Sequence, residues 1–143
     1  MPAQHIKIRI ANWPSEKENL AQIRRQVFIE EQNVPAELEW DEYDDSSRHY
    51  LASLNGKIIA TARLKPDGQI GRMAVLANYR NQGIGSKLLQ FVLKDARSQN
   101  FQQLYLHAQV DAIAFYEKQN FSVQGDIFFE ANIPHRKMLK KIC

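Results

Sequence analysis

The feature that most constrains the fold of this chain is an apolar strand that runs through a short loop into a helix. The strand covers residues 70–76, the loop narrows to Gly83-Ile84-Gly85, and an apolar stripe at helical spacing begins at Leu88. Loop glycines let a ligand approach the backbone because no Cβ intervenes. The free N–H groups at the start of the helix and the positive end of its dipole face the same loop. This arrangement indicates an anion site that suits phosphate.

Three phosphate-binding patterns compete for this loop. A P-loop requires G-x-x-x-x-G-K-[ST], which the sequence does not supply. A dinucleotide fingerprint requires a small residue at position 88, where a leucine stands. The pattern [RQ]-x-x-G-x-[GA] is met by Arg80, Gly83 and Gly85. A glycine-rich turn that binds no ligand is the alternative for this motif taken alone.

Length and composition bound the class of protein. A chain of 143 residues predicts one domain, residues 1–143, with enough chain for an apolar core. The formal net charge of +3 is too small to argue for nucleic acid by itself. Cys143 is the only cysteine, so no disulfide framework or Cys-based metal site can form. With no long apolar run and no signal-peptide pattern, the sequence predicts a cytoplasmic protein.

Hydrophobic spacing predicts the remaining elements. A period-two alternation predicts a strand over residues 6–10, and Ser15 with Glu18 forms a capping-box pattern for a helix that ends near Asn33. Asn55-Gly56 predicts a hairpin that begins a three-stranded meander. The order β-α-β-β-β-α-β-α-β-β predicts a mixed sheet with helices on both faces. The later elements follow the same spacing rules, with strands at 104–108, 121–129 and 138–142 and a helix at 111–120.

An acidic segment, residues 35–47, interrupts the regular pattern. It contains Leu38, Trp40 and Tyr43, which are costly to leave in water. A folded loop that lies over a pocket therefore fits this segment better than a solvated linker does.

A second motif gives the first one a context. The stretch from Ala112 to Phe121, AIAFYEKQNF, resembles the A-x-x-[FL]-Y-x-[KR]-x-G-F motif of the GCN5-related N-acetyltransferase (GNAT) family, whose pyrophosphate loop the first motif also resembles. The two motifs occur in the family's order, and the resemblance extends from Ile6 to Ile142. Residues 27–35 and 133–135 are further similar to the ElaA/YjcF-type branch. Asn120 replaces the family's glycine, and asparagine tolerates the left-handed conformation that ends a helix.

The resemblance implies both a fold and an activity. The fold is a mixed, mostly antiparallel sheet of six to seven strands, splayed between strands 4 and 5. The activity is transfer of an acetyl group from acetyl-CoA to a primary amine in a ternary complex. Gln109 stands where the family often has an asparagine that assists the coenzyme. The residues that the resemblance assigns to the coenzyme are Met73, Ala74, Val75, Arg80, Asn81, Gln82, Gly83, Ile84, Gly85, Ser86, Gln109 and Phe115.

Acyl transfer to an amine needs a neutral amine, a donor for the oxyanion and a proton for the departing thiolate. The resemblance assigns the donor to the Val75 N–H and the proton to Tyr116. A tyrosine pKa of about 10 against about 8.5 for a thiol makes that proton transfer uphill by roughly 2 kcal/mol. The alternative is an aromatic core pair, Phe115-Tyr116. His107 lies on the opposite strand face from Leu106 and is explained as a packed histidine.

The general base stays open among four residues. Glu31 ends the first helix and is our first candidate, and Glu39, Asp41 and His135 could serve through water. Gln32, Glu39, Asp41 and His135 are predicted to bind the amine, because an acidic lining would attract a cation. For each carboxylate alone, a surface salt bridge is the alternative. The histidines and carboxylates show no metal-ligand spacing, so no metal is expected.

Two other functions stay open. A coenzyme A-binding module would sense acyl-CoA without catalysis. A nucleic-acid binder would use residues 135–137 with Lys140-Lys141, although a solvated edge strand also explains this basic run. The prediction is an enzyme that acts on a small-molecule or peptide amine and binds neither nucleic acid nor membrane. An exposed final strand would also allow pairing into a homodimer.

Overall fold

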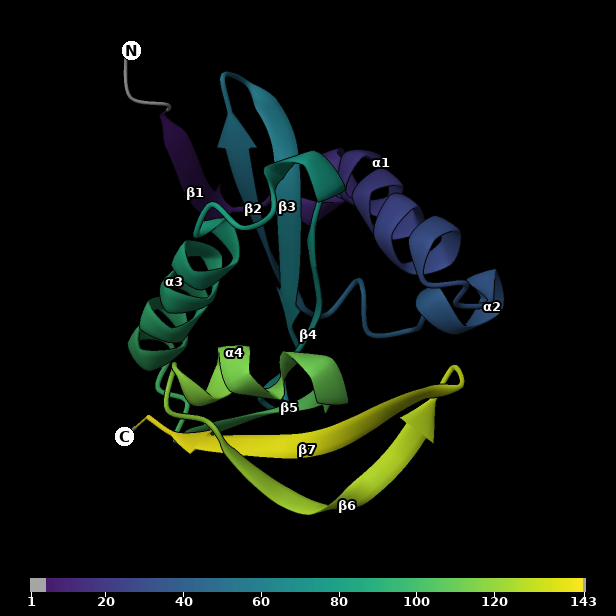
Figure 1. Ribbon diagram of the computed structural model, residues 1–143. Coiled ribbons are helices and arrows are strands. Elements are labelled where there is room, and N and C mark those ends of the chain that lie inside the picture. Colours follow the sequence, from purple (N-terminus) through teal and green to yellow (C-terminus); the bar gives the residue numbers. More distant parts are fainter. Residues whose placement is uncertain (1–4, 143) are drawn as a thin grey trace.

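Seven strands form one sheet in the order β1-β2-β3-β4-β5-β7-β6 (Figure 1). The computed structural model of the protein describes residues 5–142. Every neighbouring pair is antiparallel except β4 and β5, which run parallel. The predicted mixed, mostly antiparallel sheet is confirmed. The strands span Ile6–Ile10 (β1), Arg48–Leu54 (β2), Lys57–Leu64 (β3), Gln69–Val75 (β4), Gln103–Gln109 (β5), Ser122–Glu130 (β6) and Ile133–Lys141 (β7).

Helices cover the two faces of the sheet unequally (Figure 1). On one face, α3 (Ile84–Ser98) packs its apolar stripe against the sheet, and α4 (Ile113–Glu117) lies beside it. On the other face, α1 (Trp13–Arg24) continues into a π-helix (η1, Arg25–Glu31) and then the short α2. Single 3-10 turns precede α3 and α4. The short elements are α2 at Ala36–Glu39, η2 at Ala77–Tyr79 and η3 at Val110–Ala112.

The helix α1 begins earlier than the capping-box pattern predicted. Asn12 is the N-cap, and its side chain accepts a hydrogen bond from the Ser15 N–H at 3.4 Å. The Glu16 carboxylate accepts from the Asn12 N–H at 2.8 Å. Asn12 therefore takes the N-cap role that was assigned to Ser15, and Glu16 takes the role that was assigned to Glu18. Pro14 fits the first turn because its missing N–H would have no helical acceptor there.

The sheet opens between β4 and β5. These two strands pair only at Gln69–Tyr105 and Ile70–Leu106. Immediately after Ile70, a bulge in the β3–β4 pairing places Arg72 at a φ of 49°. A bulge bends its strand and redirects side chains. The predicted splay between the fourth and fifth strands is confirmed.

The C-terminal strand does not form the edge of the sheet. β7 pairs with β5 on one side and with β6 on the other, so the expectations of an exposed final strand and of a basic edge are wrong. Arg136 donates to the Gly125 carbonyl, and Lys140 donates to the Gln119 carbonyl at 2.9 Å. These two basic side chains thus bond to carbonyl groups of their own chain. No helix within residues 5–142 is long and apolar enough to cross a membrane.

Candidate active site

A cavity of about 800 Å³ fills the opening between β4 and β5. Alternation along the strands divides its lining between the two faces of the sheet. The side facing α3 and α4, here called the donor half, is lined by Met73, Val75, Gly85, Phe115 and Tyr116. The opposite side, here called the acceptor half, is lined by Arg63, Arg72, His107, Glu130 and His135.

The glycine loop ends beside the donor half. Gly83 has a φ of 80°, a left-handed conformation that strains other residues, and a Cβ built there would meet no atom within 4 Å. No side chain caps α3, and its first intrahelical acceptor is the Gly83 carbonyl, which accepts from the Lys87 N–H at 3.1 Å. The N–H groups of residues 84–86 therefore lack helical acceptors. They are available to an anion such as a pyrophosphate.

Gly85 joins this loop to the rest of the donor half. A Cβ on Gly85 would lie 3.5 Å from the Phe115 ring and 3.8 Å from the Met73 Cε. The first turn of α3 thus lies against side chains from both β4 and α4. The Ile84 side chain lies in the core, so only its backbone faces the loop. Asn81 and Gln82 are exposed on the loop. Gaps that a side chain would fill, beside free amides, fit a phosphate chain such as that of coenzyme A.

The edge of β4 offers further backbone donors. The Leu76 N–H donates to the Ile59 carbonyl at 2.9 Å. Val75, which pairs with Ala60, therefore turns its own N–H and C=O away from β3 and toward the opening. The Arg80 Nε donates to the Val75 carbonyl at 2.8 Å.

Arg80 also determines the position of Glu31. Its two terminal nitrogens donate to the two Glu31 carboxylate oxygens at 2.9 and 3.0 Å. Glu31 is not among the described residues that line the cavity. Nearby, the Gln109 Nε2 donates to the Gln32 Oε1 at 2.8 Å, which links the end of β5 to the segment after η1. Gln32 and Gln109, predicted for different ligands, are thus direct partners.

Tyr116 lies on α4 at the border of the donor half. Its ring contacts Phe115 edge-to-face, with centroids 5.0 Å apart, and Phe121 with centroids 6.0 Å apart. Its hydroxyl makes no hydrogen bond to any of the described residues. Removal from water raises the pKa of Tyr116 to about 12. The aromatic pair that was one alternative from the sequence is present, and Tyr116 also lines the cavity, as the alternative role of an acid would require.

Three arginines neutralise the predicted acidic lining. Arg24 contacts Glu39 at 2.8 Å and Asp44 at 2.9 Å, and it is almost completely buried. Arg63 contacts Asp41 at 2.7 Å and Asp44 at 2.9 Å. Arg72 contacts Asp41 at 3.1 Å and Glu39 at 3.3 Å. The three carboxylates come from α2 and the turns that follow it. The six charged residues are here called the ion cluster: Arg24, Arg63, Arg72, Glu39, Asp41 and Asp44.

The ion cluster corrects the expectation of an acidic lining that attracts a cation. Three guanidinium groups balance its three carboxylates. Burial raises the pKa of Glu39. Burial also acts on Asp41, but the hydrogen bond and charge of Arg63, together with Arg72, hold the pKa of Asp41 below its usual value. The segment 35–47 does fold over the pocket, as expected, and contributes Leu38, Glu39, Asp41 and Tyr43 to its lining.

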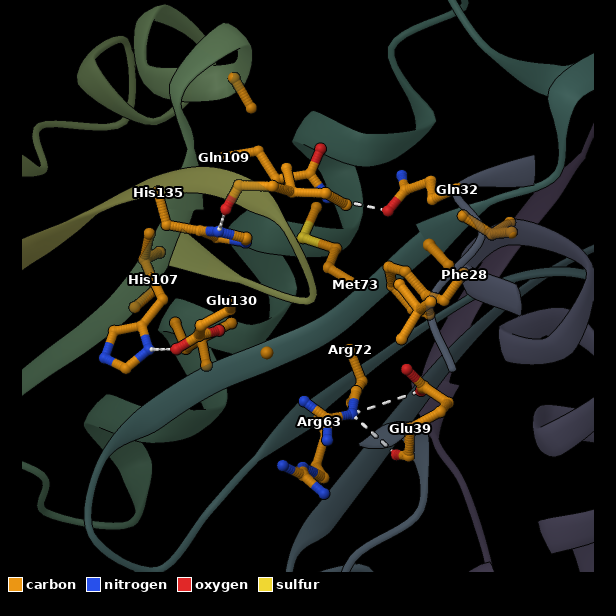
Figure 2. A pocket seen from close by; sticks show the side chains of 18 of the residues that line it. Phe28, Gln32, Glu39, Arg63, Arg72, Met73, His107, Gln109, Glu130 and His135 are labelled. Carbon is orange, nitrogen blue, oxygen red and sulfur yellow. Dashed lines mark hydrogen bonds and ion pairs between the residues drawn. The ribbon is translucent and has the colours of Figure 1, made fainter. Parts of the chain in front are cut away.

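The other side of the acceptor half contains a histidine–carboxylate pair that sequence reasoning missed. His107 Nδ1 lies 2.7 Å from the Glu130 Oε1, and this hydrogen bond lowers the pKa of Glu130 (Figure 2). Glu130 is the last residue of β6 and belongs to no motif. Only the pairing of β6 through β7 to β5 brings it beside His107. His107 is therefore more than the packed histidine that the sequence indicated.

His135 is held in one tautomer. Its Nδ1–H donates to the Ile133 carbonyl at 2.7 Å, which leaves Nε2 without a proton in the neutral ring (Figure 2). Phe128 stacks on the ring at 5.9 Å between centroids, and His135 is 7% exposed. A neutral imidazole with a fixed tautomer at a cavity surface can accept a proton. Among residues 5–142, no group of three or more metal-ligating side chains could hold a metal ion.

Comparison with known proteins identifies this arrangement. The sequence model of a family described as "Acetyltransferase (GNAT) family" matches residues 14–121. The uncharacterized N-acetyltransferase YjcF of Bacillus subtilis (strain 168) is 32% identical over 139 residues, which cover 94% of this chain and 99% of YjcF. Protein ElaA of Escherichia coli (strain K12) is 30% identical over 131 residues, 86% of each chain. The crystal structure of a putative N-acetyltransferase from Lactobacillus plantarum superposes with a TM-score of 0.88 at 27% identity, covering 96% of this chain and 99% of that one.

Proposed function

The chain belongs to the acetyltransferase (GNAT) family, whose members are in general acyl-CoA-dependent, and we propose that it transfers an acetyl group from acetyl-CoA to a primary amine. Bound acetyl-CoA supplies the activated thioester. The observation that carries the proposal is a set of free backbone donors along the donor half, here called the backbone row. The row runs from the Val75 N–H at the end of β4 to the free amides of residues 84–86.

The backbone row would bind the coenzyme and orient the thioester. The amides of residues 84–86 and the αL turn at Gly83 would hold the pyrophosphate. The open edge of β4 at Met73 and Val75 would pair with the pantetheine amides, as an added strand does. The Val75 N–H would stabilise the negative charge that develops on the carbonyl oxygen. The Val75 carbonyl is occupied by Arg80, so the N–H is the group that stays available.

We propose that His135 accepts the proton of the amine. Its Nε2 is unprotonated in the tautomer that Ile133 imposes, and the ring lines the acceptor half. Glu39 and Asp41 are held by arginines, which lowers their availability as bases. Glu31 uses both carboxylate oxygens on Arg80, a contact that suits positioning of the loop that contains Arg80. Glu31 remains the base predicted from sequence, but the geometry favours His135.

Tyr116 would donate the proton that the departing thiolate takes. The amine nitrogen bonds to the carbonyl carbon and the carbon–sulfur bond breaks. The amine proton goes to His135 Nε2, the Tyr116 proton goes to the thiolate, and proton exchange with solvent returns both side chains to their starting state. Burial raises the pKa of Tyr116 to about 12. Removal of the coenzyme thiol from water would shift its pKa in the same direction, so the two shifts would partly cancel in the free energy of the proton transfer.

Calorimetric titration with acetyl-CoA tests the binding half of this proposal. Gly83→Asp and Gly83→Asn introduce nearly isosteric side chains that both tolerate a left-handed φ, but only Asp adds negative charge. We expect wild type and Gly83→Asn to bind acetyl-CoA and Gly83→Asp to lose most of its affinity. Equal binding by the two variants would show that no phosphate lies at this loop. Release of coenzyme A that depends on an added amine would then separate an enzyme from a module that only senses acyl-CoA.

A further inference from the structure

We infer that the amine acceptor of this enzyme carries a carboxylate, which binds to Arg63 and Arg72 in the acceptor half. This inference rests on the proposed function, since it names the substrate class of the same site. Three observations support it: the hydrogen-bond donors of the two arginines that have no acceptor, the ion cluster that holds both arginines in place, and the histidines and carboxylate on the opposite side of the cavity.

Arg72 presents a free end of its guanidinium group to the cavity. Nε donates to the Glu39 carbonyl at 3.2 Å, and Nη2 contacts the Asp41 carboxylate at 3.1 Å. Within residues 5–142, no acceptor is found for Nη1. The side chain is 26% exposed and lines the cavity. Its backbone is left-handed at a bulge, which is costly for a residue with a side chain and is frequent where a functional group must be aimed.

Arg63 has unused donors as well, although it is 3% exposed. Its Nη1 contacts both Asp41 and Asp44. Its Nε is out of contact with solvent and has no hydrogen-bond partner in the part of the chain that the structure describes. Nη2 likewise has no acceptor among these residues. A donor without an acceptor is unfavourable where it is buried, so a ligand oxygen that accepts a hydrogen bond from Arg63 would be favoured.

The ion cluster holds these two arginines in place before any ligand arrives. Asp41 contacts both of them, and Glu39 and Asp44 link them to the buried Arg24. Pre-organised guanidinium groups lose little conformational freedom when they bind a planar carboxylate. The ion cluster contains three arginines and three carboxylates, so it is neutral as a whole. A ligand with a single carboxylate therefore meets no net repulsion from the cluster. A doubly charged phosphate would lose more hydration free energy at a site without net positive charge, so the structure favours the carboxylate.

The groups that would receive the amine lie across the opening. Figure 2 shows Arg63 and Arg72 on one side of the cavity, and His107, Glu130 and His135 on the other. A carboxylate at the arginines would direct an amine on the same small molecule toward the Glu130 carboxylate and the His135 ring. The acceptor class is therefore a small amino acid or an amine with a carboxylate at similar spacing.

Matched pairs of amines test the substrate class. Release of coenzyme A from acetyl-CoA would be measured with amino acids and with their carboxamides, which lack only the charge. Rates are compared at equal concentrations of the neutral amine, because amidation lowers the amine pKa. We expect kcat/KM to be at least about tenfold higher for the carboxylates. Equal or higher values for the carboxamides would overturn the inference, and so would a preference for aminoalkylphosphonates.

Variants of Arg72 test the location. Arg72→Gln removes the positive charge, and Arg72→Lys keeps the charge but loses the pair of donors that binds a carboxylate through two hydrogen bonds. Arg136→Gln is the control, because Arg136 bonds to Gly125 outside the cavity. We expect Arg72→Gln to abolish the preference for carboxylates, Arg72→Lys to keep part of it, and the control to keep all of it. A preference that survives in Arg72→Gln would contradict this site, as would equal losses for both members of each pair.

A binding measurement separates this inference from the proposed function. N-acetyl amino acids and their amides would be titrated into wild type with coenzyme A, without turnover. Tighter binding of the acid, lost in Arg72→Gln, supports the carboxylate site. Equal binding, or no binding of either, refutes it even when amines are acetylated. Failure to bind acetyl-CoA at all would instead refute the proposed function.

Discussion

Replacement of Arg24 by methionine should destabilise the protein strongly. Arg24 is 1% exposed and donates four hydrogen bonds, two to Glu39 and two to Asp44, at 2.8 to 3.4 Å. Its guanidinium also lies 4.9 Å from the centre of the Trp40 ring. Methionine fills similar volume but leaves the Glu39 carboxylate buried with only the longer 3.3 Å contact to Arg72.

The expected loss in the free energy of unfolding is about 3–5 kcal/mol, the range for a buried ion pair that loses one partner. This is a large part of the total for a domain of this size, which is about 5–15 kcal/mol. The cost comes from an uncompensated buried charge. Adding Glu39→Gln to Arg24→Met should therefore restore part of the stability, with a coupling of about 1–3 kcal/mol.

Urea unfolding followed by tryptophan fluorescence measures these values, since Trp40 reports on the cluster. Arg25→Met is the matched control, because Arg25 is exposed and lies 5.7 Å from the same ring. The control should change stability by no more than about 0.5–1 kcal/mol. A loss below about 1 kcal/mol in Arg24→Met would refute the view that the cluster is a buried, pre-organised support. Strictly additive effects in the double variant would refute it too.

The pH dependence of Arg24→Met follows from Glu39. Burial places the folded pKa of Glu39 above its unfolded value, so the protonated carboxyl favours the folded state. The free energy of unfolding of the variant therefore increases as the pH falls through the raised folded pKa of Glu39 toward the unfolded value of about 4.3. Stability that falls over this range in the variant, relative to wild type, would contradict the assignment.

Three further predictions concern single side chains. Tyr116→Phe should lower kcat by about 10²–10⁴-fold and leave acetyl-CoA affinity unchanged by calorimetry; an unchanged kcat would remove the acid role. His135→Gln should lower kcat by about 10²-fold or more while Glu31→Gln lowers it less, and the reverse order in steady-state assays would restore Glu31 as the base. Tyr50→Phe should cost about 1–3 kcal/mol in urea unfolding, because the Tyr50 hydroxyl donates to Asp95 at 2.6 Å. Although burial opposes it, hydrogen bonds from Arg48 and Tyr50 lower the pKa of Asp95, so this stabilisation is present at neutral pH and is lost as the pH falls through the lowered folded pKa. A Tyr50→Phe loss that is constant down to pH 2 would refute that linkage.

The sequence predicted helices and their ends correctly where residues close together in the chain determine them. The stripe at Leu88, Leu89 and Val92 is fully buried, as helical spacing indicated. Asn33 and Asn120 take left-handed φ values of 58° and 67° at the helix ends, as their residue type suggested. The start of α1 was misplaced because two overlapping polar patterns compete there, and a weak cap at Asn12 supported by Glu16 prevails.

Long-range pairing determined the parts that the sequence misplaced. His135-Arg136-Lys137 suggested a basic edge, but β6 returns to the outer side of β7 and makes it an inner strand. Glu130 and His107 are 23 positions apart and meet only through that strand order. Glu39 and Asp41 suggested an attraction for cations, but arginines from α1, β3 and β4 neutralise them.

By itself, the sequence determined the family, the order of the elements and the glycine loop that precedes α3. These depend on periodicity, glycine conformation and motif spacing, which act over a few neighbouring residues and are visible in the chain. Only the tertiary structure decided which charges are compensated, which histidine presents a free nitrogen, and which arginines keep unused donors. Those properties depend on partners brought together by the sheet, because the electrostatic free energy of a side chain is set by its neighbours in space.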